Sequence, residues 1–189
     1  AENSQNLQTL FATAKKEKQS LESSLETNTD EYRSQVNATI AKFEECQQLI
    51  SRLSLFSPNE SLEDIALEIY STFDTHRLMH TAADFPFRYL TVDYLLADLL
   101  QRSPNPDRES VLRRSLGEYE KYLSRLDDYG LLSPADKKLY ERYLENPSSF
   151  TLASMNDPAA RREVKIARFR EEKELKQKLE VQLYPARAS

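Results

Sequence analysis

His76 and His80 are the only histidines in the chain, and they lie four residues apart. On a helix this spacing places both imidazoles on one face, where they could chelate zinc with Asp74 or Asp84 as a third ligand. The zinc-protease motif also needs a glutamate directly after the first histidine as its general base, and Arg77 stands there instead. We therefore favour surface or partly buried histidines over a metal site.

No recognisable catalytic centre follows from the other reactive residues. No serine, threonine or cysteine lies in a nucleophile motif, and two glycines, Gly117 and Gly130, are too few for a phosphate-binding loop. Asp93 lies in the most apolar stretch with helical spacing, where a structural hydrogen bond or ion pair explains a carboxylate better than catalysis does. We expect a protein that is not an enzyme and that needs no cofactor.

A basic stretch is the strongest candidate for binding. Eight Lys/Arg and five Glu fall between Arg161 and Glu180, in a chain of net charge −5. Arginine can fork onto carboxylates, lysine acts as a point charge, and phenylalanine can bury between them, which suits capture of an acidic protein surface. On composition alone, a solvated charged face is the more common explanation. The candidates share helical spacing in two overlapping rows: Arg162, Lys165 and Phe169, and Arg161, Lys165 and Arg168.

Two further patterns have simpler explanations. Tyr119, Tyr122, Tyr140 and Tyr143 have helical spacing and could stack on nucleic-acid bases, but the net acidity and the absence of a broad Lys/Arg stripe disfavour nucleic acid. Core and groove positions explain these tyrosines better. Arg113-Arg114-Ser115 resembles a site for a basic-directed kinase, a triplet that is common by chance.

The composition fits a soluble globular protein, with 39% apolar and 30% charged residues. Cys46 is the single cysteine and cannot form an internal disulfide, which indicates a reducing compartment. No apolar run approaches the roughly 18 residues of a membrane span. We expect a monomer in the cytoplasm, also with nuclear access, that contacts neither membrane nor nucleic acid.

The elements that must position these residues are helices. Apolar residues recur at spacings of three, four and seven along most of the chain, and local signals mark helix starts at Ser61, Ser133 and Asp157. Phe85-Pro86 breaks the pattern, because the residue before a proline resists helical angles. The pattern predicts about seven helices, with apolar stripes in 4–26, 32–53, 61–73, 90–100, 111–126, 134–144 and from 158 onward.

Helices of this kind, joined by short connections, pack as antiparallel pairs, and the second is expected to pair antiparallel with the first. No strand is convincing, and no clean repeat of about 34 residues is present. The expected fold is all-α, a divergent tetratricopeptide-like helical bundle or solenoid. We expect a single all-helical domain over residues 1–184 and a terminal tail over 185–189.

Four segments of the chain, in this order, resemble one protein family. They run from Leu53 to Ile65, from Tyr89 to Tyr94, from Tyr119 to Leu132 and from Arg162 to Leu175. Together they resemble the N-terminal domain of the type 2A phosphatase-associated protein family, whose mammalian member is called alpha-four or immunoglobulin-binding protein one. The resemblance extends over residues 7 to 183, although the spacing between Ile65 and Tyr89 is longer than in the family.

The resemblance implies a non-catalytic regulator with a tetratricopeptide-like domain. Family members bind catalytic subunits of type 2A and related serine/threonine phosphatases, stabilise them in a chaperone-like manner and connect them to rapamycin-sensitive nutrient (TOR) signalling. The family's phosphatase-contacting arginine and lysine lie three residues apart, just before an isoleucine, and match Arg162 and Lys165 before Ile166. The alternative is a generic helical-repeat adaptor that binds acidic peptides.

Overall fold

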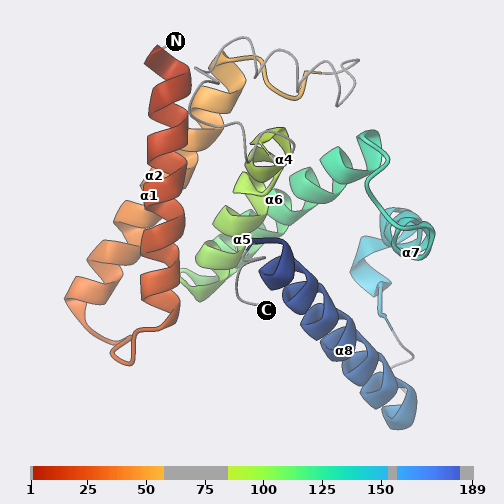
Figure 1. The fold of residues 1–189 in the computed structure, drawn as a ribbon. Coiled ribbons are helices and arrows are strands. Elements are labelled where there is room, and N and C mark those ends of the chain that lie inside the picture. The colour runs from red at the N-terminus through yellow and green to blue at the C-terminus, as the bar shows by residue number, and fades with distance from the viewer. Residues whose placement is uncertain (1, 58–84, 153–156, 184–189) are drawn as a thin grey trace. The chain divides into compact units, whose positions relative to one another are not determined.

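The computed structural model of the chain describes residues 2–57, 85–152 and 157–183. Every regular element in these ranges is a helix and none is a strand, which confirms the all-α fold (Figure 1). The tetratricopeptide-like arrangement stays a prediction. The elements in chain order are α1 (Glu2–Glu22), α2 (Asp30–Arg52), α4 (Phe85–Leu90), α5 (Val92–Arg102), α6 (Arg108–Asp128), α7 (Pro134–Glu145), the 3-10 turn η3 (Pro147–Ser149) and α8 (Pro158–Leu183).

The chain divides into two compact units, Ala1–Leu132 and Ser133–Ser189. The first unit contains α1, α2, α4, α5 and α6, and the second contains α7, η3 and α8. The expectation of one domain over residues 1–184 stays a prediction.

Two helix pairs build the first unit. α1 and α2 run antiparallel, as predicted, and α5 pairs with α6 (Figure 1). α2 also packs against α5, so the two pairs meet through these two helices. Thr29 starts α2, because its hydroxyl oxygen accepts the backbone N–H of Tyr32 at 3.1 Å.

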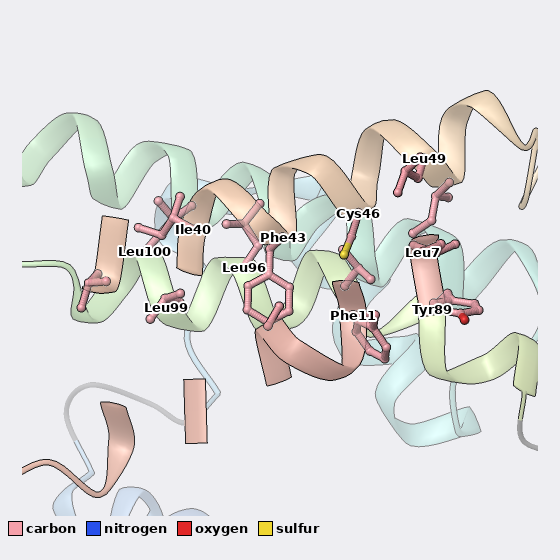
Figure 2. Packing of buried hydrophobic residues seen from close by; sticks show 14 of the residues in the cluster. Leu7, Phe11, Ile40, Phe43, Cys46, Leu49, Tyr89, Leu96, Leu99 and Leu100 are labelled. Atoms are coloured by element: carbon pink, nitrogen blue, oxygen red, sulfur yellow. The ribbon is translucent and has the colours of Figure 1, made fainter. Parts of the chain in front are cut away.

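Apolar side chains of α1, α2 and α5 meet in one core (Figure 2). Phe43 of α2 is fully buried in it, and burying a side chain of this size stabilises a fold by about 1.5–3 kcal/mol. The rings of Phe11 and Tyr89 pack edge to face, with centroids 5.4 Å apart. The core includes Leu7, Phe11, Val36, Ile40, Phe43, Cys46, Leu49, Tyr89, Leu96, Leu99 and Leu100.

A buried polar network joins α2, α5 and α6. Asp93 is only 1% exposed, and its two carboxylate oxygens accept hydrogen bonds from Gln47 and from Arg125, each at 2.6 Å. The Gln47 amide also donates to Glu118 at 2.7 Å, and Lys121 donates to Glu118 at 3.0 Å. This confirms the prediction that Asp93 is held by structural hydrogen bonds and an ion pair.

The packed face of α6 differs from the predicted one. The predicted apolar stripe includes Leu116, but this side chain is half exposed, and the buried residues of α6 are Val111, Ser115 and Glu118. Ser115 donates to the backbone carbonyl of Ala97 at 2.8 Å. Polar residues can therefore occupy this face, because each one finds a hydrogen-bond partner there. Ser115, the serine of the Arg113-Arg114-Ser115 triplet that resembles a kinase site, is therefore buried in the fold.

Two helix boundaries also differ from the predicted ones. α1 ends at Glu22, and Leu25, which falls inside the predicted helix over 4–26, is 99% exposed. The Ser23 hydroxyl donates to the carbonyl of Ser20 at 2.9 Å, a local bond that competes with the helical pattern. Phe85 and Pro86 begin α4 instead of breaking a helix, because proline is tolerated in a first turn. The predicted helix over 61–73 lies outside the described residues.

Candidate partner-binding site

α8 carries every residue of the predicted binding site, and Asp157 fixes its start. The Asp157 Oδ1 atom accepts the backbone N–H groups of Ala159 and Ala160, each at 3.0 Å. Pro158 follows at the first helical position. A backbone N–H at this position has no acceptor within the helix, so proline, which lacks one, is well tolerated there. The predicted helix start is confirmed, and it determines where the basic residues fall along α8.

Arg162, Lys165 and Phe169 lie on one face of α8, and all three are exposed. Phe169 is 67% exposed, which is notable for so large an apolar side chain. Ile166 and Lys173 are also exposed on this face, and the same spacing of three and four residues would have identified them. These five residues form the Arg162 face. No carboxylate in the described part of the chain pairs with Arg162 or Lys165.

Arg168 differs from the other predicted residues, because carboxylates of the second unit already pair with it. Its guanidinium donates to Asp136 of α7 and to Glu171 of α8, each at 3.1 Å. Arg161 is exposed, and none of the described carboxylates pairs with it. The predicted row of Arg161, Lys165 and Arg168 is therefore divided: Arg168 joins α8 to α7, and Arg161 is available at the edge of the Arg162 face.

Ser133 and Asp136 form the anchor that holds Arg168. The Ser133 hydroxyl accepts the backbone N–H of Asp136 at 3.1 Å and donates to its carboxylate at 2.7 Å, which confirms the predicted start of α7. This hydrogen bond, and next the Arg168 guanidinium, lower the pKa of Asp136 below its ordinary value of 3.8. The hydrogen bond to Asp136 in turn raises the pKa of Arg168. The ion pair is therefore fully charged near neutral pH.

The four tyrosines of the possible stacking platform lie in two clusters, one in each unit. In the first unit, Tyr119 and Tyr122 pack against Tyr94, with ring centroids 5.8 and 5.5 Å apart. In the second unit, the rings of Tyr140 and Tyr143 lie 6.5 Å apart at an interplanar angle of 16°. Packing against neighbouring aromatic rings accounts for these side chains without a ligand.

Metal binding and membrane crossing each require a particular arrangement of residues. No group of three or more His, Cys, Asp and Glu side chains in the described ranges could hold a metal ion. The residues of the possible zinc site, His76, His80, Asp74 and Asp84, lie outside those ranges. None of the helices in residues 2–57, 85–152 and 157–183 combines the length and apolar character that a membrane crossing requires.

Several proteins of known family resemble this chain. The PP2A regulatory subunit TAP46 of Arabidopsis thaliana is 28% identical over 137 residues, which are 72% of this chain and 27% of the relative. TAP46 of Nicotiana tabacum is 28% identical over 173 residues, covering 92% of this chain and 35% of the relative. Type 2A phosphatase-associated protein 42 of Saccharomyces cerevisiae is 28% identical over 178 residues, covering 82% of this chain and 43% of the relative. The chain thus spans less than half the length of these relatives. No solved structure matches it significantly.

A family-wide sequence profile matches most of the chain. Residues 7–69 and 84–187 match the TAP42-like family. The two ranges leave out residues 70–83, which contain both histidines and fall within the stretch that is longer than in the family. The second range includes α5 to α8 and the whole Arg162 face. The chain belongs to the TAP42-like family.

Proposed function

We propose that this protein is a non-catalytic, chaperone-like regulatory subunit that binds catalytic subunits of type 2A-like serine/threonine phosphatases. Family membership supports the proposal, as do the names of its relatives, a PP2A regulatory subunit and a type 2A phosphatase-associated protein. The resemblance further implies a link to rapamycin-sensitive TOR signalling, and we expect the protein to act in the cytoplasm and nucleus.

The exposed Arg162 face is the observation that carries this proposal. It places a guanidinium and an ammonium group, neither paired with a described carboxylate, beside an exposed phenyl ring. Arg162 is suited to bidentate contact with a carboxylate, and Lys165 adds a second positive charge. Phe169 and Ile166 supply the apolar contact that removes water from those ion pairs. The expected docking surface on the phosphatase is acidic, with an apolar pocket at its centre.

Arg168 has a different role in this proposal. Its ion pair with Asp136 is made within the second unit, so it links α8 to α7 at one point beside the Arg162 face. Arg168 is therefore a positioning residue, whereas Arg162 and Lys165 contact the partner.

The test measures affinity for a purified type 2A catalytic subunit by calorimetry. We expect R162E/K165E to weaken binding by about 30-fold or more, because each reversed charge leaves an acidic partner group unpaired. F169A should weaken binding about tenfold through lost apolar contact. The matched control is K138E/K178E, which reverses two exposed lysines of the same unit outside the Arg162 face.

Circular dichroism should show unchanged helical content in all of these variants. Undiminished binding by R162E/K165E would rule out the site. A pull-down that recovers many acidic-peptide proteins and no phosphatase would favour the alternative, a generic helical-repeat adaptor.

A further inference from the structure

A groove of about 580 Å³ runs along α1 in the first unit. Phe11, Lys15 and Lys16 of α1 line one side, and Arg88 and Leu95, from α4 and α5, line the other. All of these residues belong to the same compact unit. The groove is therefore built by well-packed helices, and it shares no residue with the Arg162 face of α8.

The charges at one end of the groove cancel one another. Lys18 is buried and donates to the carboxylates of Glu22 and Asp98, the latter at 2.6 Å. Arg102 completes this group through Asp98, at 3.3 Å. Burial alone would lower the pKa of Lys18, but its two carboxylate partners outweigh that effect and raise it. These four residues therefore add no net charge to the groove.

Lys15 and Lys16 leave the rest of the groove positive. No carboxylate of the described residues pairs with either side chain, although the chain as a whole has a net charge of −5. The Lys15 ammonium lies 5.6 Å from the centre of the Phe11 ring. The groove walls withdraw part of this side chain from water, which lowers its pKa, and repulsion from Arg88 lowers it further.

The floor of the groove is apolar. The half-buried Leu95 side chain supplies its accessible apolar surface beside the two lysines, and the Phe11 ring, only 4% exposed, closes the floor from the core side. A small anion would pair with the lysines and leave the apolar surface in contact with water. A peptide can pair with the lysines and also cover the apolar surface. The combination fits a chain segment that carries carboxylates next to an apolar side chain.

We propose that the α1 groove binds an acidic peptide segment of a partner protein. The carboxylates of the segment pair with Lys15 and Lys16, and its apolar side chain lies against Leu95. This site is additional to the phosphatase contact proposed for α8. Loss of one site should therefore leave the other intact.

The experiment uses the full chain and a short fluorescent peptide with a central leucine between glutamates, read by fluorescence anisotropy. We expect saturable, salt-sensitive binding that K15E/K16E weakens about tenfold or more. The matched control, R33E/R52E, reverses two exposed arginines of α2 in the same unit and should change the affinity less than about twofold. The same peptide with glutamines in place of glutamates should not bind.

Chemical shifts should locate the peptide at the amides of Ala12, Lys15 and Leu95. Equal affinity of K15E/K16E and the unmodified chain would overturn the proposal, as would equal binding of the glutamine peptide. Displacement of the peptide by an equal concentration of inorganic phosphate would overturn it too, since it would indicate a simple anion site. If K15E/K16E does not fold, K15Q/K16Q replaces it. Both variants should retain phosphatase binding, which separates this test from that of the Arg162 face.

Discussion

The Arg125 guanidinium donates to the Asp93 carboxylate at 2.6 Å, and this contact joins α6 to α5 inside the first unit. Gln47 of α2 donates to the other oxygen of the same carboxylate, so three helices meet at one acidic group. A buried carboxylate is unfavourable without such partners. The charge of Asp93 is therefore satisfied only when α2, α5 and α6 have this one alignment.

Replacing Asp93 should show how far the stability of the first unit depends on this carboxylate. We expect Asp93→Asn to lower the free energy of unfolding by about 3 kcal/mol, because Arg125 and Gln47 lose their charged acceptor. Asp128→Asn is the matched control, since Asp128 is exposed and its loss should change stability by less than about 0.5 kcal/mol. Urea denaturation followed by circular dichroism measures both. Equal losses in the two variants would contradict the role given to Asp93.

Ser115 should resist phosphorylation in the folded protein. It is 2% exposed and bonded to Ala97, and Arg113 and Arg114 pair with Glu109 and Glu44. We expect a basic-directed kinase to modify a synthetic peptide around Ser115 and to leave the folded chain unmodified, as measured by mass spectrometry. Partial unfolding in urea should make the site available. Full phosphorylation under native conditions would show that α6 opens far more readily than its packing implies.

Cys46 should be unreactive until the first unit unfolds. Burial, and next the charge of Glu45, raise the pKa of its thiol to about 12. Only the thiolate reacts with iodoacetamide, so at pH 8 alkylation of the folded chain should be at least about 100-fold slower than in denaturant. The rate should rise with urea along the unfolding transition. Rapid alkylation of the native chain would mean that the core around Cys46 is open to reagent.

Asp136 gives the second unit a defined response to acid. The pKa of Asp136 is lower in the folded chain than its ordinary value of 3.8 in the unfolded chain. The stabilisation that the ionised carboxylate contributes is therefore fully present above about pH 3.8. It is lost as the pH falls through the lowered pKa of the folded chain. Carboxyl NMR titration should show that Ser133→Ala raises this pKa more than Arg168→Gln does, because the Ser133 hydrogen bond is the larger cause. Ser124→Ala, at an exposed position in α6, should leave it unchanged.

The starts of α7 and α8 could be predicted from sequence, because their causes are local. Ser133 and Asp157 each cap a helix through a backbone N–H two or three residues away, and a proline follows each of them. The positions of Arg162 and Lys165 on one face of α8 follow from helical periodicity in the same way. Their placement on a shared face needs no tertiary contact.

Other features depend on contacts between residues far apart in the sequence. The buried face of α6 could not be predicted, because Glu118 is satisfied by Gln47, a residue of α2. Hydrophobic spacing favours the leucines of α6, and it cannot show that a distant amide makes a glutamate suitable for burial. For the same reason helical spacing places Arg168 in one row with Arg161 and Lys165, and it cannot show that Asp136 of α7 pairs with Arg168.

The packing of α2 against α5 also has a consequence for the speed of folding. Contacts within the α1–α2 and α5–α6 hairpins are close in sequence, and local pairs of this kind form rapidly. α2 and α5 are separated by the whole stretch from Leu53 to Thr91, and closing so long a loop carries an entropic penalty. We therefore expect the docking of two early hairpins to limit the rate at which the first unit folds. In stopped-flow experiments, core mutations between α2 and α5 should slow refolding more than equally destabilising ones within a hairpin.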